Sequence, residues 1–377
     1  MGFGLGKNSP VTLTQSRDNF EALIHRHGQR VRWRASAKCP CVTETGRPDL
    51  RCEKCGGLGE TYGFLRERED SFSAAARDGF AAIPDEFAEA RILEILDGRG
   101  ASLAFERMGG FVRIDEPGFP ASAVIDARAS VPLVRRVENV ALEKAGGGYW
   151  RVPGLLVEPS KTGGGRPSGD LVALRGLRDS SGAEPKVLGL RRDMALVDAD
   201  AESLFADSAE YVMPVRVVLL AQELSTADAA FVAASSGSAL CVFPYSLGIS
   251  EGDALTALSG AMIGKLVIEK RGGDGRDRIP EFHVEGVDRL ETRDALYEEG
   301  RDFAIVGSNE IHWLGARPTA GAKMAITYRY FPTYRVAKEA PGLRTSGDQR
   351  IPRKAALQLF SAYSEARKLN GSWEALP

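Results

Sequence analysis

Four of the five cysteines lie within seventeen residues, and they form the densest group of potential metal ligands in the sequence. Cys39 and Cys41 flank a proline, ten residues follow, and Cys52 and Cys55 then form a Cys-x-x-Cys pair. Two close thiol pairs joined by a short loop can surround one tetrahedral cation, and zinc is the ion that most often fills such a site. The spacing therefore predicts a structural zinc site with Cys39, Cys41, Cys52 and Cys55 as ligands.

The residues around these cysteines favour tight turns. Gly56, Gly57 and Gly59 follow the second pair, and glycines there let the backbone turn and point amides toward the thiolate sulfurs. The loop between the pairs contains the turn formers Gly46 and Pro48-Asp49. Because four thiolates leave no open coordination position, we expect the metal to stabilise the fold and not to activate water.

The sequence also allows other chemical states of these four cysteines. Cys-Pro-Cys is tighter than the usual Cys-x-x-Cys, and the four thiols could instead form two disulfides or stay reduced without a ligand. An iron–sulfur cluster gains no specific support from Cys-x-Cys spacing. The fifth cysteine, Cys241, lies in an apolar segment, and we expect it to be a buried apolar side chain.

Length and composition indicate an ordinary globular protein. The chain has 377 residues, which is enough for two or three domains. A net charge of -2 gives neither the basic excess of a protein that wraps nucleic acid nor an acidic excess that would mimic it. The 42 glycines and 19 prolines indicate many turns, and this favours a β-rich structure with loops.

The sequence predicts no membrane segment, because it contains no run of about 18 apolar residues. Its first residues lack the apolar run of a signal peptide, and Gly6 occupies the position where a myristoylation motif needs Ser or Thr. We therefore expect synthesis in the cytoplasm, where reduced thiols favour metal binding over disulfides.

Helices are expected near both ends of the chain. Residues 16–27 have the pattern of a short helix that stops at Gly28. Ile351-Pro352 is expected to open an amphipathic helix that runs to about Leu369. Residues 86–95 predict a short helix or a helix–strand junction.

The segment that enters the cysteine cluster, residues 30–34, alternates as a strand does and places three arginines on one face. Arg30, Arg32 and Arg34 could contact phosphate or an acidic partner, or they could form a solvated face, which is the interpretation we favour. Residues 66–80 are charged and irregular and predict a linker.

The rest of the chain predicts strands. Residues 101–220 contain several short strands, and residues 239–336 form the clearest β module, in which Trp313 and Tyr328 are expected to pack inward. The segments 211–218 and 330–336 have a similar order of Tyr, Pro, Arg and Val, which either a tandem duplication or chance would explain.

These patterns together predict a mainly β fold with short flanking helices, built from tandem β-sandwich or barrel-like modules. The expected domain ranges are residues 1–70 for an N-terminal helix and zinc knuckle, 71–238 for a middle β-rich domain, 239–337 for a C-terminal β module, and 338–377 for a C-terminal loop and helix.

Two segments resemble structural proteins of tailed bacteriophages. Residues 32–59, with the four cysteines, resemble N-terminal zinc-knuckle segments of such proteins. The C-terminal segment is similar to a β module of phage tail, neck and baseplate components, and its marks are Tyr297-x-x-Gly300-x-Asp302-Phe303, Asn309-x-Ile311-x-Trp313, Pro318-x-x-Gly321 and Tyr328-x-Tyr330-x-Pro332-x-Tyr334. The resemblance implies a structural subunit of a tail, baseplate or neck assembly. Such a subunit is made in the host cytoplasm, is part of the virion and contacts other virion proteins or further copies of itself.

The sequence lacks the residue patterns of an enzyme active site. An enzyme would need a nucleophile, a base or an open metal position, yet His283 and His312 lack the carboxylate spacing of a zinc hydrolase and Gly-x-Ser-x-Gly is absent. We therefore predict no enzymatic activity and no catalytic or cofactor-binding residues.

The alternative to a structural subunit is a zinc-knuckle protein that binds nucleic acid. It would use Arg30, Arg32, Arg34 and Lys38, and its binding would fall steeply with salt. The half-site Cys52-x-x-Cys55-x-Gly57-x-Gly59 also resembles one repeat of the cysteine-rich domain of the Hsp40 co-chaperones.

Overall fold

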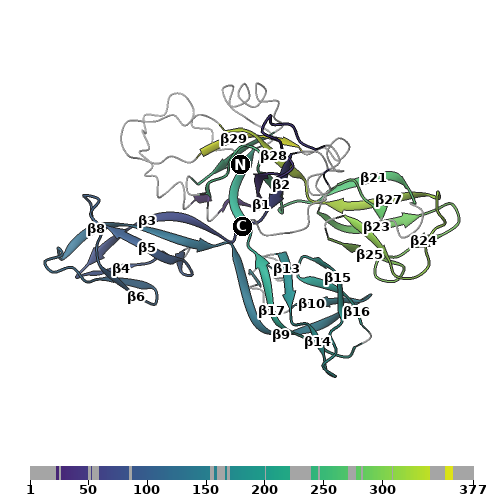
Figure 1. Cartoon of the computed structure of the whole chain (residues 1–377), viewed down its shortest axis with the longest axis horizontal. Helices are drawn as coiled ribbons and strands as arrows, with labels where there is room; N and C mark the ends of the chain where they lie inside the picture. The colour runs from purple at the N-terminus through teal and green to yellow at the C-terminus, as the bar shows by residue number, and fades with distance from the viewer. Residues whose placement is uncertain are drawn as a thin grey trace.

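The computed structural model describes a protein built almost entirely of β-strands (Figure 1). The residues that it describes are 23–24, 27–49, 52, 59–84, 87–152, 157–158, 166–167, 170–199, 201–220, 239–244, 247–270, 277–281, 283–307, 309–339 and 353–359. Among these residues, no helix is both long and apolar enough to cross a membrane. The mainly β fold with barrel-like sheets predicted from the sequence is confirmed.

A closed barrel forms the centre of the molecule. Its strands, in spatial order, are β18 (Val215–Leu220), β19 (Ala239–Phe243), β29 (Arg353–Leu359), β28 (Thr333–Glu339), β20 (Ala254–Ala257) and β1 (Gln29–Lys38). The sheet closes because β1 pairs with β18 through Gln29, Arg30 and Val31 and with β20 through the residues that follow. The outer half of β1 pairs with β2 (Glu60–Gly63), which extends the sheet beyond the barrel.

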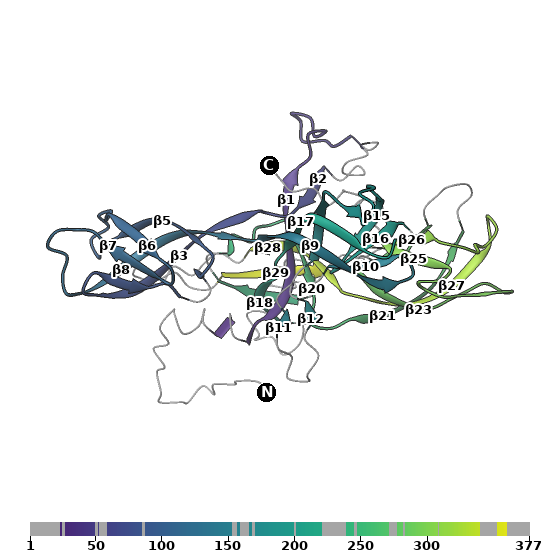
Figure 2. The same cartoon turned by 90° about the horizontal axis from the view of Figure 1, so that it is seen from below.

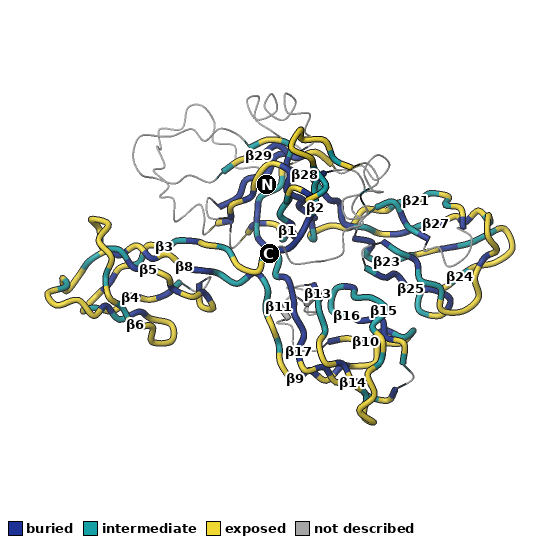
Figure 3. Tube along the Cα trace, viewed as in Figure 1, coloured by how far each residue is buried: buried dark blue, intermediate teal, exposed yellow. Residues whose placement is uncertain are grey.

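The barrel interior is packed with apolar side chains. Val31 and Trp33 point into it from β1, and Phe243, Leu255 and Leu357 meet them from three other strands. Figure 3 shows these central strands largely in the colour of buried residues, whereas the outlying turns are exposed. Alternation along β1 puts Arg32 and Arg34 on the opposite, outer side of the barrel wall.

The first lobe, residues 67–132, is inserted between β2 and the next lobe (Figures 1 and 2). It is one six-stranded sheet in the order β5-β8-β3-β4-β7-β6. The strands are β3 (Glu67–Arg77), β4 (Phe80–Ala82), β5 (Arg91–Leu96), β6 (Phe105–Met108), β7 (Phe111–Ile114) and β8 (Ser122–Pro132). Its own core contains Phe72, Ile95, Val112 and Ile125.

The second lobe, residues 134–212, follows directly and has a separate core around Trp150, Leu204 and Tyr211. Its main sheet has the order β13-β17-β9-β10-β16-β15, and β14 also pairs with β17. The strands are β9 (Val134–Gly146), β10 (Tyr149–Arg151), β13 (Asp170–Arg175), β14 (Arg178–Asp179), β15 (Lys186–Arg191), β16 (Met194–Asp198) and β17 (Leu204–Val212), with the separate pair β11 (Val157–Glu158) and β12 (Arg166–Pro167).

The third lobe, residues 262–330, is inserted between β20 and β28. Two small sheets, β21-β27-β23-β24 and β22-β26-β25, enclose a core that contains Phe303, Ile326 and Tyr328. The strands are β21 (Met262–Glu269), β22 (Asp277–Arg278), β23 (Val284–Glu291), β24 (Leu296–Tyr297), β25 (Phe303–Val306), β26 (Glu310–Trp313) and β27 (Lys323–Tyr330). As expected from the sequence, Tyr328 is fully buried, while Trp313 is half-buried against this core.

The first two lobes leave the barrel at a common point. The amides of Leu133 and Val134 donate to the carbonyl of Arg66, at 2.8 and 3.1 Å, and the amide of Met213 donates to the carbonyl of Leu133 at 2.8 Å. The chain therefore enters and leaves both lobes beside the barrel wall.

Packing between the second and third lobes is close. The Tyr149 hydroxyl donates to the carbonyl of Ile305 at 2.9 Å. Gly189 lies directly against Val306, because a Cβ built on the glycine would be 1.9 Å from Val306 Cγ1. A salt bridge between Arg191 and Glu299 flanks this contact.

Several sequence-based element assignments are wrong. Residues 353–359 are strand β29 and not part of a helix, because Ala355, Ala356 and Leu357 complete the barrel between β19 and β28. The expected linker, residues 66–80, contains β3, which pairs with β8 over eleven residues. Of the two alternatives expected for residues 86–95, the structure fits the helix–strand junction, because a helical residue at Phe87 is followed by strand β5.

The sheets also divide the chain differently from the four expected domain ranges. Segments from 1–70, 239–337 and 338–377 meet in one barrel, and the range 71–238 spans most of two lobes and one barrel strand, β18. The expected helices at 16–27 and beyond residue 359 lie largely or wholly outside the described residues.

Candidate metal centre

The cysteine cluster lies at the loop end of the β1–β2 hairpin. The two strands pair antiparallel from Ala35↔Gly63 to Lys38↔Glu60. The Cys39 amide then donates to the carbonyl of Gly59 at 2.8 Å, which continues the ladder by one residue. The strands therefore place Cys39 at the base of the loop that carries the other cysteines.

Cys-Pro-Cys is a β-turn. The Val42 amide donates to the Cys39 carbonyl at 3.0 Å, so Cys39 and Val42 are its first and last residues. Pro40 occupies the second position, which its fixed φ angle favours. The turn puts Cys41 in the third position, beside Cys39. It thus brings the two cysteines together although only one residue separates them in the sequence.

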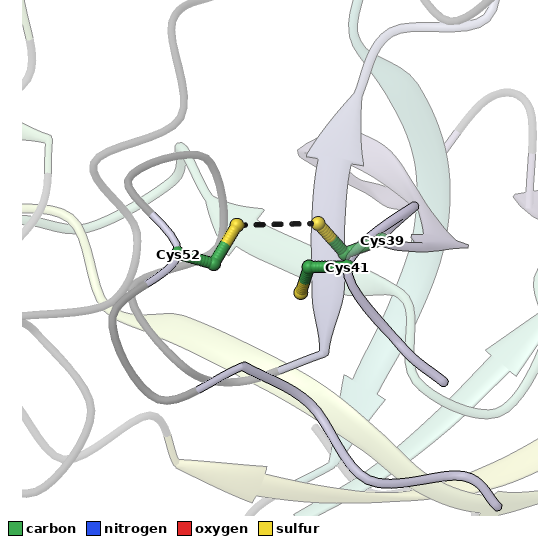
Figure 4. A group of neighbouring side chains, drawn as sticks. All are labelled: Cys39, Cys41 and Cys52. Atoms are coloured by element: carbon green, nitrogen blue, oxygen red, sulfur yellow. Dashed lines mark hydrogen bonds between the residues drawn. The ribbon is translucent and has the colours of Figure 1, made fainter. Parts of the chain in front are cut away.

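The rest of the loop returns the chain toward this turn. The Thr43 amide donates to the Arg47 carbonyl at 3.1 Å, and Gly46 between them has a φ of +78°. The Cys52 amide donates to the Asp49 carbonyl at 3.0 Å. These turns bring Cys52 back to the first cysteine pair (Figure 4).

The three described cysteines have distances suited to one metal ion. The Sγ atoms of Cys39 and Cys52 are 3.8 Å apart, and the Sγ atoms of all three cysteines lie within 4.8 Å of one another. Two thiolates on one tetrahedral zinc, with Zn–S bonds of about 2.3 Å, are separated by about 3.8 Å. Cys39 is buried and the other two are half-buried.

The structure brings three of the four predicted ligands close together. Cys39, Cys41 and Cys52 converge, and the fifth cysteine, Cys241, is buried as expected. Cys55, the fourth predicted ligand, lies outside the described residues. The cluster can therefore hold a metal ion; that the ion is zinc stays a prediction.

A buried carboxylate fixes the hairpin to the barrel. Asp253, at the start of β20, accepts hydrogen bonds from Trp33 Nε1 at 2.8 Å, the Ser36 amide at 2.8 Å and the Ser250 amide at 2.9 Å. Burial raises the pKa of this carboxyl group, and the donated hydrogen bonds oppose that shift. The sequence carries no local signal for this residue other than the turn pattern Gly252-Asp253.

A second contact fixes β2. Arg335 of β28 places Nη2 2.8 and 2.9 Å from the two carboxylate oxygens of Glu60. Tyr62 donates its hydroxyl to the same carboxylate at 3.2 Å. The base of the metal loop is therefore attached to the barrel through both of its strands.

Two of the three arginines of β1 do not form the solvated face that the sequence favoured, whereas Arg30 is half-buried. Arg32 and Arg34 are only 6% and 7% exposed, because the second and third lobes cover the outer side of β1. Arg32 Nε donates to Asp170 Oδ2 at 2.6 Å, and Arg34 Nη2 lies 3.4 Å from His283 Nε2. These two buried side chains contact other residues of the protein and are not accessible to a phosphate group.

His283 has a structural position between these arginines. Arg32 also contacts its Nδ1 atom, so both ring nitrogens face a guanidinium. Burial, followed by the charges of Arg32 and Arg34, holds the pKa of His283 well below its usual value. His312 is on a different sheet, where it pairs with Ala304, and among the described residues it belongs to no metal-ligand group.

Comparison of the sequence with protein-family models finds no match, and no curated protein matches it either.

Proposed function

We propose that the protein is a structural subunit of a tailed-bacteriophage particle, in its tail, baseplate or neck, and that it acts through protein–protein contacts. The sequence resemblance suggests this assembly, and the architecture supports a role of this kind. Its strongest support is that three β lobes, each with a core of its own, are arranged around one barrel (Figure 1). Such a shape offers separate surfaces to separate neighbours.

The buried contacts between the barrel and two of its lobes suit a structural subunit that holds neighbouring proteins at fixed positions. Arg32 of the barrel, Asp170 of the second lobe and His283 of the third lobe meet in one buried cluster. Because breaking a buried charged contact costs far more than breaking an exposed one, this cluster resists movement of the lobes relative to the barrel.

The outer face of the first lobe carries exposed apolar side chains. Val124 is 61% and Phe111 53% exposed, and Met108 pairs with Phe111 on the neighbouring strand. Phe80 is exposed on β4. Exposed apolar side chains gathered on one face are typical of surfaces that contact another protein.

The metal has a structural role in this proposal. The loop of residues 39–59 is small and its described part buries few apolar side chains, so a bound ion would supply much of its folding free energy. Structural zinc supplies on the order of 10 kcal/mol in finger peptides. The ion would hold the loop in a defined shape at the end of β1 and β2.

The proposal is tested by quantitative mass spectrometry of virus particles purified by density gradient. We expect the chain in particles at a fixed ratio to the other tail, baseplate or neck proteins, and the ratio should persist after high-salt washing. Infected-cell lysate depleted of particles is the control. If the chain is abundant in that lysate and absent from particles, the structural role is wrong.

A further inference from the structure

Strand β21 is an open edge of the third lobe. It pairs with β27 along all eight of its residues, from Met262↔Tyr330 to Glu269↔Lys323, and within the described part of the chain it pairs with no other strand. It lies along the outer border of that lobe (Figure 1). A long open edge offers a row of backbone donors and acceptors to another strand.

The side chains of β21 alternate between two faces. Leu266 and Ile268 pack against the core of the lobe. Ile263, Lys265, Val267 and Glu269 point the other way and are exposed, with Ile263 and Val267 at 67% and 63%. Two large apolar residues and two opposite charges therefore share the solvent face of one edge strand.

The edge is also held in a regular conformation. Gly264 has no side chain, and the ring of its cross-strand partner Tyr328 fills that space, since a Cβ on Gly264 would be 2.4 Å from the ring. Covering of an edge glycine by an aromatic ring across the strands fixes the register of a sheet. Contacts with β27 alone therefore hold the backbone of β21 in a regular strand, and within the described residues no strand pairs with its outer edge.

We propose that β21 pairs antiparallel with β21 of a second copy of this chain, about a two-fold axis at Val267. In this register Lys265 of each copy lies opposite Glu269 of the other, and Val267 lies opposite Val267. Leu266 lies opposite Ile268 on the core side. Opposite charges and apolar side chains in directly opposed positions stabilise a strand pair.

The other two-fold registers fit less well. Opposed residues of an antiparallel pair point to the same face, so the axis must pass through a residue and not between two residues. An axis at Lys265 would oppose two like charges. An axis at Leu266 would oppose Lys265 to Val267 and Ile263 to Glu269, leaving all charges unmatched. Of these three axes, only the one at Val267 places Lys265 opposite Glu269 and the core-facing Leu266 opposite Ile268.

The pairing would join two four-stranded sheets into one continuous eight-stranded sheet. Because it overlaps only about five residues of each copy, it buries much less area than a stable dimer interface of about 1,200–2,000 Å². The dimer is therefore weak in dilute solution. This inference does not rest on the proposed function, since the purified chain can pair outside any particle.

Charge reversal at β21 tests the register. Sedimentation velocity of the full chain over a wide concentration range should show a concentration-dependent monomer–dimer equilibrium. Lys265→Glu and Glu269→Lys should each raise the dimer dissociation constant at least about tenfold, because two symmetry-related pairs become like-charged. The double variant Lys265→Glu/Glu269→Lys should restore dimer formation. Circular dichroism and thermal melting show whether each variant keeps its fold, since both side chains are exposed.

Cross-linking provides a second measurement that does not depend on the charges. Val267→Cys should form an intermolecular disulfide on mild oxidation, because directly opposed Cβ atoms are about 4.5–5.5 Å apart. Ile263→Cys is the matched control, with similar exposure and the same face, but the two copies of residue 263 would be about 27 Å apart at about 3.4 Å per residue. Monomer at every concentration, a double variant as weak as the single ones, or equal cross-linking at both positions would overturn the proposal.

Discussion

Arg32 of the central barrel and Asp170 of the second lobe form a buried ion pair, with Arg32 Nε 2.6 Å from Asp170 Oδ2. They are 138 positions apart in the sequence. The pair lies where β1 passes the start of β13, and the same arginine reaches His283 of the third lobe. One side chain of the barrel therefore contacts both of the lobes that pack against it.

Removal of Asp170 should be strongly destabilising. In Asp170→Ala the charge of Arg32 stays buried without its carboxylate, and loss of one partner of a buried pair costs about 3–5 kcal/mol in free energy of unfolding. Denaturant titration measures the change. Asp115→Ala is the control, because Asp115 also pairs with an arginine, Arg113, but on the exposed surface, and it should change stability little. Equal effects of the two substitutions would contradict the buried role of Asp170.

His283 should make the protein less stable in mild acid. Its pKa is lowered in the folded state by burial and by Arg32 and Arg34. Below a pH of about 6.5 the unfolded chain binds a proton on this histidine that the folded chain does not bind. The stability contributed by neutral His283 is therefore present above about pH 6.5 and decreases as the pH falls toward 5.

His283→Asn tests this dependence. His283 has a φ of +57°, a left-handed conformation that asparagine also tolerates, so the variant keeps the backbone and removes the titrating group. Between about pH 7.5 and about pH 5.5, the free energy of unfolding should decrease less for the variant than for the wild type. Asp170, the acid of this cluster, is unchanged in both proteins, and identical slopes would show that His283 does not titrate in this way.

The sequence predicted the cysteine cluster because its ligands are close together along the chain. Turn formers such as Pro40 and Gly46 act within a few residues, and the local pattern alone brings Cys39, Cys41 and Cys52 together. Strand patterns were likewise visible in the third lobe, which lies within the β module expected at residues 239–336.

The barrel could not be predicted in the same way, because its contacts are distant in sequence. The charged segment 67–77 resembled a linker, yet its strand is specified by β8, more than forty residues later. Residues 353–359 were expected to belong to a helix, but pairing with β19 and β28, which are distant in sequence from one another, makes them a strand. The burial of Arg32 depends on Asp170 and His283, which no local pattern connects to it.

Gly59 should be essential to the shape of the metal loop. Its φ is +79°, and an added Cβ would be 3.1 Å from Val42 Cγ2 and 3.2 Å from Pro48 Cβ. Gly59→Ala therefore adds a close contact to the cost of a left-handed residue, which is about 1–2 kcal/mol. Gly46→Ala is a matched control, because its φ is +78° and nothing lies within 4 Å of an added Cβ. Thermal unfolding should show a larger loss for Gly59→Ala, and metal affinity should fall only in that variant.

Metal analysis tests the cluster directly. Protein purified under reducing conditions without chelator should contain about one zinc per chain. Cys52→Ser should lose the metal and increase hydrogen exchange of the amides in β2, since the loop that joins β2 to β1 is no longer held. Cys241→Ala removes a buried cysteine of the barrel core instead, and it should keep the metal. Wild-type protein without any bound metal, or full metal content in Cys52→Ser, would refute the prediction.

Gly189 and Val306 should control the contact between the second and third lobes. A Cβ on Gly189 would overlap Val306 Cγ1, at 1.9 Å, so Gly189→Ala should destabilise the protein by forcing the two strands apart. Overpacking of this kind costs about 1–3 kcal/mol. Val306→Ala removes the overlapping methyl group and leaves a small cavity, so it should also destabilise when made alone.

In the double variant Gly189→Ala/Val306→Ala the new methyl group of residue 189 enters the space that the valine left. The loss of stability should therefore be smaller than the sum of the two single losses, by more than the roughly 0.3–0.5 kcal/mol within which independent sites add. Denaturant unfolding of the wild type and the three variants measures this coupling. Strict additivity would mean that residues 189 and 306, and with them β15 and β25, do not pack against each other in solution.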